Sequence, residues 1–445
     1  MIVSDAKAGC LPAKRRWTFC VGNIIEHYDT ALFGFLSPYL APLLFPEERP
    51  VTALFFVYVI MSISRIVNPV GALFFGVAGD LFGKRKVLAV TLVGMGIVSA
   101  GMGCIPTYVR VGLWSPLLFF LGRLLQNFFM SGEAVGGAVM LLEEGGGAGL
   151  GGRFRFPVSS DLLSGLYQSS TIVGNIVAAF ALSGVIAYGR AQGSEGVDPG
   201  WRFLYFVGGA AAVVGYLLRG RGCATREKSR SVSTYEEGKN RVCAFFSHGK
   251  EIFALRRKEL FIIAINMGFS YASYVITFHL MNGFIPLITP FSKAQMIRIH
   301  AWLLLFDGLT LPLFGYVASK IGRNSFMCGV ASISFLAIPL TVILPGASLL
   351  SIILIRLFFT VSGAAFAAPL YSWAVSLVPK THRYGTVALG NALGVQLLGA
   401  PTAAISLRLY EKTGIVSSIS WYWVALGAVA FVCMKKRFAR VSHAL

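Results

Sequence analysis

Apolar runs long enough to cross a bilayer recur along the whole chain, separated by short breaks that are charged or contain Gly or Pro. A bilayer core requires roughly 20 mostly apolar residues per helix. Such runs are too numerous and too evenly spaced to form the core of a soluble domain. They predict twelve transmembrane helices, at about 17–42, 54–78, 87–105, 114–142, 164–188, 201–219, 259–288, 298–318, 325–345, 349–376, 384–409 and 416–434.

One long charged segment, at about 220–258, lacks apolar periodicity and divides the predicted helices into two groups of six. The division predicts an all-α integral membrane protein with two pseudo-symmetric six-helix bundles, as in transporters built from internal repeats. Residues 1–219 form the predicted N-terminal bundle, and 220–258 form a cytoplasmic linker. Residues 259–445 form the C-terminal bundle with a short cytoplasmic tail.

Composition agrees with a membrane protein, because 56% of the 445 residues are hydrophobic and only 13% are charged. The formal net charge of +20 raises the possibility of a nucleic-acid partner. The basic residues, however, sit beside the predicted helix ends, and their bias places both termini in the cytoplasm of a plasma (inner) membrane. We therefore expect contacts with the lipid bilayer and none with nucleic acid.

The sequence contains no signature of an enzyme. The seven cysteines show neither paired nor metal-ligand spacing, and the chain carries no nucleophile motif and no ATP-binding motif. We expect no enzyme activity, no metal and no cofactor.

A repeat at an offset of 239 residues carries Gly76 onto Gly315, Gly83 onto Gly322 and Lys84 onto Arg323. Each copy predicts a tight glycine turn between two helices, followed by cations. The second copy has Ser319 where the first has Asp80. The first copy does not fit a phosphate-binding loop, because Lys84 is followed by Arg rather than Ser or Thr.

This repeated turn resembles the loop signature of the major facilitator superfamily. Within that superfamily, the run from Gly22 through Glu26 to Asp29 resembles the metabolite:proton symporter family, as do Asn68-Pro69, Gly200-Trp201-Arg202 and His382-Arg383-Tyr384. That family includes proline and betaine, 2-oxoglutarate, citrate and shikimate permeases. The chain departs from the family at Asn68, where Arg is usual, and Arg65 one turn earlier is the expected substitute.

The resemblance implies a gating role for the repeated turn. An Asp at this depth can cap a neighbouring helix N-terminus and pair with a cation, which would hold the cytoplasmic side shut. The alternative is a solvated turn that only fixes topology. The gating residues implied are Gly76, Asp80, Gly83, Lys84, Arg85, Gly322 and Arg323.

Charged residues inside the predicted helices carry most of the functional information, because burying a charge in lipid costs free energy unless the charge is paired or faces water. Glu26 and Asp29 share a face of the first helix, and Glu133 follows Arg123 on the fourth. We expect Glu26, Asp29 and Glu133 to couple transport to protons, with fixed ion pairs between helices as the alternative. Arg356 lies near the outer third of its helix, where snorkelling is the alternative to binding.

Further polar side chains are predicted to face a shared polar pathway. The repeat places Asp307 opposite Asn68, on the equivalent helix of the second half. Hydrogen bonding between helices is the competing explanation for each of them. The predicted substrate-binding residues are Tyr28, Arg65, Asn68, Arg123, Gln126, Tyr271, Tyr274, Asp307 and Asn391.

These features together predict a secondary active transporter, acting as a monomer and driven by a proton gradient. The predicted substrate is a small carboxylate or zwitterionic metabolite, moved together with a proton by alternating access. Uniport or antiport by the same fold, and a non-transporting receptor, are the alternatives. The intramembrane arginines favour an anionic group, but the nearby acids leave an anion and a zwitterion equally open.

Overall fold

The computed structural model describes residues 13–48, 50–145, 159–191, 200–220, 254, 256–291 and 293–442. Most of the predicted linker at 220–258 lies outside these ranges, as do the first 12 residues and the last three. The boundaries of the two halves therefore stay predictions.

Six membrane-length helical segments form the first bundle. They are α1 (Ala13–Leu44), α2 with the 3₁₀ turn η1 and α3 (Pro50–Ile63, Ser64–Val67, Asn68–Phe82), α4 (Lys84–Cys104), α6 (Trp114–Gly145), α7 (Ser160–Ala191) and α8 (Gly200–Gly220). The short α5 (Tyr108–Val111) lies between α4 and α6. Most of these segments extend a few residues beyond the predicted ends, because the polar residues that flank an apolar run continue the helix.

Six further segments form the second bundle, so the predicted twelve-helix fold is confirmed within the described residues. They are α10 with η2 and α11 (Arg257–Tyr274, Val275–Leu280, Met281–Ile288), α12 (Lys293–Ile321), α13 with η3 and α14 (Arg323–Ile333, Ser334–Leu336, Ala337–Val342), α15 with α16 (Leu349–Ala367, Leu370–Leu377), α17 with η5 and α18 (Arg383–Leu393, Gly394–Gly399, Thr402–Thr413), and α19 (Ser418–Ser442). The 3₁₀ turn η4 (Leu344–Gly346) joins α14 to α15.

Two of these segments contain a π-helical turn that the apolar pattern does not signal. The first, η2, follows Tyr274, and the second, η5, follows Leu393. They are spatially connected, since a Cβ on Gly399 of η5 would lie only 2.8 Å from the Cβ of Tyr271 on α10. Single π turns occur frequently at functional sites.

Ten of the segments in the described ranges are long and apolar enough to cross a membrane by length and composition. α1 and α6 are not among them. Both carry buried polar residues: Glu26 and Asp29 on α1, and Arg123 and Gln126 on α6. The two helices outside this set are therefore those that carry Glu26, Asp29 and Arg123.

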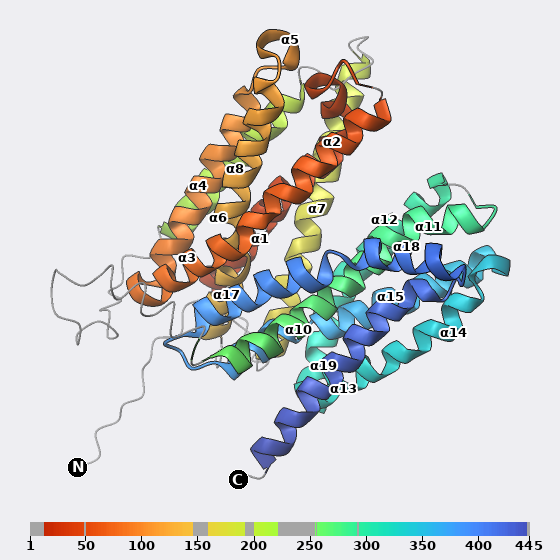
Figure 1. Ribbon diagram of the computed structural model, residues 1–445. Coiled ribbons are helices and arrows are strands. Elements are labelled where there is room, and N and C mark those ends of the chain that lie inside the picture. The colour runs from red at the N-terminus through yellow and green to blue at the C-terminus, as the bar shows by residue number, and fades with distance from the viewer. Residues whose placement is uncertain are drawn as a thin grey trace, which may run out of the picture.

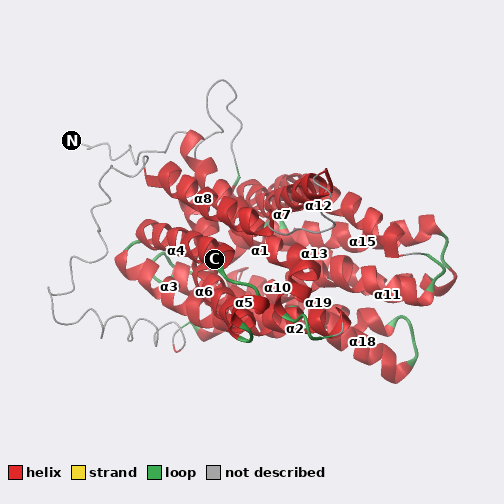
Figure 2. Ribbon diagram, turned by 90° about the horizontal axis from the view of Figure 1, so that it is seen from above, coloured by secondary structure: helices red, strands yellow, loops and turns green. Residues whose placement is uncertain are grey.

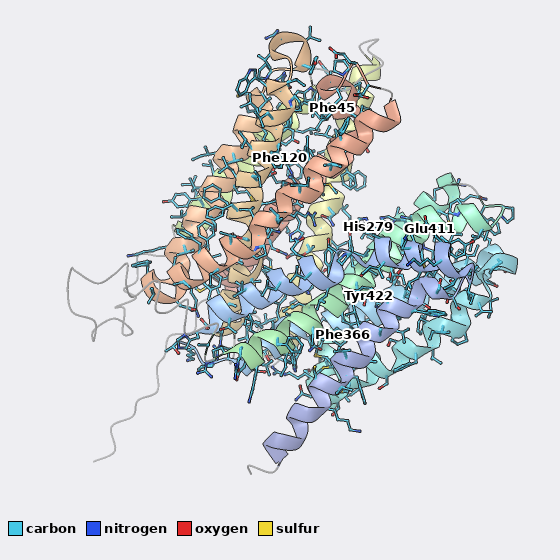
Figure 3. All side chains as sticks on the ribbon, viewed as in Figure 1. Phe45, Phe120, His279, Phe366, Glu411 and Tyr422 are labelled. Carbon is cyan, nitrogen blue, oxygen red and sulfur yellow. The ribbon has the colours of Figure 1, made fainter. Side chains whose placement is uncertain are left out.

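The two bundles converge at one end of the molecule (Figure 1). This end carries the Gly83 and Gly322 turns and is called the Gly83 end below. Here α3 packs beside α17, and α7 beside α12; Figure 2 shows the latter pair where the bundles meet. Toward the opposite end the bundles diverge, with Phe45 at that end of the first bundle and His279 and Glu411 toward that end of the second (Figure 3).

Glycines permit the closest approach between the bundles. A Cβ on Gly76 of α3 would lie 2.6 Å from the Cα of Gly385 on α17, and one on Gly315 of α12 would lie 2.4 Å from the carbonyl oxygen of Asp161 on α7. Only glycine permits backbones to meet this closely. The equivalent turn residues Gly83 and Gly322 have φ values of 101° and 94°. The predicted tight glycine turns are thus confirmed in both copies.

Candidate functional site

A chain of hydrogen bonds joins three helices inside the first bundle. Asp29 of α1 is 2% exposed and accepts hydrogen bonds from the Ser99 hydroxyl on α4 and the Gln126 side-chain amide on α6. Arg123 in turn donates to the amide oxygen of Gln126, and its guanidinium lies 4.5 Å from the ring centroid of Phe33. Gln126 therefore links a buried acid to a buried base without a direct ion pair.

Glu26 and Asp29 are both buried on α1, yet they face different partners. The charge of Glu26 lies within electrostatic range of Tyr371, which belongs to α16 in the second bundle. Asp29 instead engages the interior of its own bundle. Glu133 belongs to α6, but its side chain lies outside the described residues. The charge of Glu26 therefore acts on the second bundle, whereas the hydrogen bonds of Asp29 stay within the first.

Arg65 provides a polar link between the bundles. It lies in η1, and its guanidinium donates a 3.1 Å hydrogen bond to the hydroxyl of Tyr271 on α10. No described residue forms an ion pair with it, and its buried Nε has no hydrogen-bond partner. Arg65 is therefore a cation with a neutral partner at the junction of the two halves.

Asp307 of α12 is an equally isolated acid. It is 7% exposed, and no described residue donates a hydrogen bond or an ion pair to its carboxylate. The backbone carbonyl of Asp307 accepts a 3.2 Å hydrogen bond from the Thr310 hydroxyl. The Tyr274 hydroxyl lies within electrostatic range of both Asp307 and Arg65.

The remaining predicted binding residues are distributed unevenly. Asn68 is buried at the start of α3, with an amide oxygen that has no hydrogen-bond partner. Asn391 is half-buried on α17. Tyr28 lies elsewhere, because its hydroxyl donates a 3.1 Å bond to the Leu204 carbonyl of α8 inside the first bundle. The structure thus groups Arg65, Tyr271 and Tyr274, with Asp307 within electrostatic range of Tyr274, and it places Tyr28 apart from them.

Arg356 does not snorkel toward the membrane surface, which corrects the alternative considered for it. Its side chain is 0% exposed and donates to the carbonyls of Met296 at 3.2 Å and Thr277 at 3.4 Å. Thr277 lies in the π turn η2. Packing against α12 and η2 encloses the guanidinium, so Arg356 acts on this irregular backbone rather than at the lipid interface.

At the Gly83 end, Asp80 reaches across to the N-terminus of α17. Its carboxylate accepts hydrogen bonds from the backbone amides of Tyr384 at 3.2 Å and Gly385 at 2.9 Å. Beside it, Glu143 of α6 pairs with Lys84 at 2.7 Å and with Arg383 at 2.9 Å. We call these residues, with Tyr384, the Asp80 contact. Arg85 occupies the first turn of α4, next to this group.

An equivalent contact joins α7 to the second glycine turn. Arg323 lies 3.3 Å from the Asp161 carboxylate and donates to the Ser372 carbonyl and the Ser160 hydroxyl, each at 3.0 Å. The Ser372 hydroxyl also donates to Asp161. Ser319, by contrast, bonds to the Tyr316 carbonyl one turn earlier on its own helix. We call Asp161, Ser160, Arg323 and Ser372 the Asp161 contact.

Sequence reasoning missed Asp161. The repeat shows that an acid is absent at Ser319 but does not say where a substitute lies. One signal was available, because Asp161 follows Ser159 and Ser160 at a helix start, where acids are favoured.

Known proteins resemble this chain along almost its whole length. Residues 17–220 match the family model described as "Sugar (and other) transporter". The proline/betaine transporter of Salmonella typhimurium is 24% identical over 427 residues, covering 93% of this chain and 80% of the relative. The citrate-proton symporter of Salmonella typhi is 26% identical over 447 residues, covering 99% and 96%. The chain is thus similar to carriers of small metabolites along almost its whole length.

Solved structures of superfamily members share the fold. The proton:xylose symporter XylE bound to 6-bromo-6-deoxy-D-glucose matches with a TM-score of 0.68 at 16% identity, covering 95% of each chain. The transporter FucP in its outward conformation matches with a TM-score of 0.68 at 11% identity, covering 95% of this chain and 98% of that one. The protein thus has the fold of a multi-pass membrane protein, and the matched relatives are transporters rather than enzymes, in agreement with the expectation. Members of this class generally require no cofactor.

Proposed function

We propose that this protein carries a small carboxylate-bearing or zwitterionic metabolite together with a proton across the inner membrane of a bacterium. One observation carries the proposal: Arg65 and Tyr271 bridge the two bundles by a 3.1 Å hydrogen bond, and the first bundle also holds two buried acids on α1. The relatives named above support coupling to protons, and the basic residues beside the helix ends support a cytoplasmic location for both termini.

Proton coupling is assigned to Glu26 and Asp29, with Glu26 as the titrating group. The charge of the buried Glu26 acts on Tyr371 of the second bundle, so its electrostatic surroundings change when the bundles move apart. Asp29 is already tied to Ser99 and Gln126 inside one bundle. An acid between moving parts can be protonated when one side is open and ionised when the other is.

Alternating access is assigned to rocking of one bundle against the other around the Arg65 and Tyr271 level. The Asp80 contact and the Asp161 contact hold the Gly83 end closed, and both consist of side chains from opposite bundles. The Gly83 end is assigned to the cytoplasm, so the arrangement corresponds to a carrier closed toward the cytoplasm. The proton gradient drives accumulation without a cofactor.

The test is uptake into proteoliposomes that contain the purified protein. Labelled glycine betaine, L-proline, citrate and 2-oxoglutarate are offered with the external medium more acidic than the lumen. At least one solute should accumulate above its external concentration, and a protonophore should abolish the excess. If the solute only reaches its external concentration, and the pH difference has no effect on uptake, the protein is a uniporter instead.

A further inference from the structure

Arg356 is a buried cation to which the proposed transport cycle gives no role. Its side chain is 0% exposed, and it forms no ion pair within the described residues. A charge buried in a membrane protein is costly, and its presence there points to a function. Its guanidinium nitrogens donate instead to two backbone carbonyls, that of Met296 at 3.2 Å and that of Thr277 at 3.4 Å. The second of these carbonyls lies in the π turn η2.

Thr277 is the residue whose carbonyl loses its usual partner in this π turn. In an α-helix the backbone amide of Met281 would bond to the residue four positions earlier, which is Thr277. Here the amide of Met281 bonds to Ile276, five positions earlier, as in a π-helix. Arg356 supplies a donor to the Thr277 carbonyl in its place. Because a buried carbonyl without a donor is costly, Arg356 favours the π form of η2 over the α form.

The π form also decides which side chains lie beside Tyr274. The ring of Tyr274 contacts both Phe278 and His279, with centroid distances of 5.0 Å and 5.5 Å. An α-helix turns by about 100° per residue, so a side chain five positions further on would lie about 140° around the helix from Tyr274. Phe278, four positions further on, would stay within about 40° of it. The contact between Tyr274 and His279 therefore depends on the π turn.

Through this contact His279 joins a face of the second bundle that meets the first. The rings of Tyr271 and Tyr274 have centroids 6.1 Å apart, and the Tyr271 hydroxyl accepts the hydrogen bond from Arg65. His279 is exposed and lies toward the end where the bundles diverge (Figure 3). We call Tyr271, Tyr274 and His279 the Tyr274 face. It extends the polar link at Arg65 by an aromatic surface that ends in an exposed imidazole.

We propose that Arg356 is a positioning residue, which keeps η2 in its π form and so places His279 on the Tyr274 face, where His279 contacts the transported solute. An imidazole N–H is a hydrogen-bond donor for a carboxylate, the group that the proposed solutes share. Arg356 itself is enclosed and acts only through the backbone of η2. The contact with the solute rests on the proposed function, but the effect of Arg356 on η2 does not.

Pairs of histidines test the form of η2 without any transport assay. His279 can bind Zn²⁺ together with a second histidine only if both side chains lie on the same side of the helix. Tyr274→His supplies a partner five positions earlier, which fits the π form, and Val275→His supplies one four positions earlier, which fits the α form. Zn²⁺ binding is measured as thermal stabilisation of the purified full-length protein. The same variants with His279→Ala give the background from other sites.

Removal of Arg356 should weaken the first pair and spare the second. In Arg356→Met, Zn²⁺ should bind the pair made by Tyr274→His about tenfold or more weakly, and the pair made by Val275→His at least as tightly as before. Arg356→Lys keeps a charged donor and should lie between. Arg408→Gln, at an exposed arginine of the same bundle, should change neither pair. Unchanged binding by the first pair in Arg356→Met, or equal weakening of both pairs, would overturn the positioning role.

Uptake then tests the contact with the solute. For a labelled solute that the protein accumulates, His279→Ala and Arg356→Met should each raise the half-saturation concentration. The double variant should be no worse than the more impaired single variant, because both changes remove the same contact. An unchanged half-saturation concentration in His279→Ala would overturn the contact but leave the role of Arg356 in η2 standing. If no solute accumulates, the proposed function and the contact both fail, whereas the Zn²⁺ measurement still decides the role of Arg356.

Discussion

Tyr384 of α17 donates its hydroxyl hydrogen bond to the backbone carbonyl of Gly132 on α6, in the opposite bundle. The ring fits against two further glycines: a Cβ on Gly79 would lie 2.1 Å from its Cδ1, and a Cβ on Gly136 would lie 2.6 Å from its hydroxyl oxygen. The side chain is 0% exposed. Tyr384 is thus a large residue of one bundle seated in a glycine-lined recess of the other, and it holds the Gly83 end together by shape.

Filling this recess is expected to open the Gly83 end. Gly79→Ala and Gly136→Ala should each increase the labelling rate of a single reporter cysteine, because the added methyl group leaves no room for the Tyr384 ring. Val77→Cys is a suitable reporter, since Val77 is buried between the bundles against Leu260 and Leu389.

Gly101→Ala is the control for these variants, because a Cβ on Gly101 meets nothing within 4 Å. Labelling that stays unchanged in both recess variants, at normal expression, would show that the ring finds another position in the closed state.

Neutralising Asp80 is expected to shift the protein toward the state open at the Gly83 end. Asp80→Asn removes the negative charge that faces the α17 N-terminus, an interaction of about 0.5–1 kcal/mol. The reporter at Val77→Cys should label a few times faster. Ser319→Ala is the matched control at the equivalent position, because its hydroxyl donates to the Tyr316 carbonyl of its own helix. Unchanged labelling together with normal uptake would show that Asp80 does not hold this end closed and belongs to a turn that only fixes the topology.

The Asp161 contact should show strong coupling between its charges. Asp161→Asn and Arg323→Gln are each expected to destabilise the closed state, and the double variant should cost less than the sum of the two. The interaction term should be about 1 kcal/mol or more, because the Asp161 carboxylate is nearly buried. Reporter labelling across the four proteins measures it. Strict additivity would mean that Arg323 acts only through its bonds to Ser160 and Ser372.

Rocking predicts that a covalent link at the Gly83 end stops transport. Cysteines that replace Asp161 and Ser372, whose side chains are in direct contact, should crosslink readily. Uptake should fall to the background when the disulfide forms and should return on reduction. The reduced double variant is its own control for loss of the polar contact. Full uptake by the crosslinked protein would contradict rocking.

Glu26→Gln is expected to separate accumulation from exchange. The amide imitates the protonated acid permanently, so accumulation driven by a pH gradient should be lost while exchange of labelled for unlabelled substrate continues. Both are measured in the same proteoliposomes. Accumulation that survives would transfer the coupling role to Asp29, Glu133 or Asp307. Loss of exchange as well would assign Glu26 to binding or folding.

Much of this architecture could be read from the sequence, because the bilayer imposes a length and a polarity on every span. The twelve segments, the glycine turns and the burial of Asp29, Arg123 and Asp307 follow from that rule. Local backbone irregularities do not: the π turns η2 and η5 lie in apolar stretches that read as ordinary helix.

The sequence also could not predict which residue each intramembrane charge contacts. An intramembrane charge predicts that compensation exists, but packing decides where it comes from. Arg65 was predicted only as a substrate-binding residue one turn before Asn68, and its hydrogen bond to Tyr271 in the second bundle could not be foreseen. Arg356 had snorkelling as its alternative and is instead enclosed by carbonyls. Asp161 pairs with Arg323 because α7 packs against α12 and α16 of the second bundle, which the sequence does not show.

The two contacts at the Gly83 end differ in where the acid is attached. Asp161 lies in the first turn of α7 itself, so it travels with the positive end of that helix macrodipole and compensates it in every state of the transporter. Asp80 lies on α3 and compensates the positive end of α17 only while the bundles touch. Separation therefore exposes an uncompensated helix end on α17 but not on α7, where it breaks the ion pair of Asp161 with Arg323 instead. The two sides of the pseudo-symmetric interface thus lose different kinds of interaction when the bundles part.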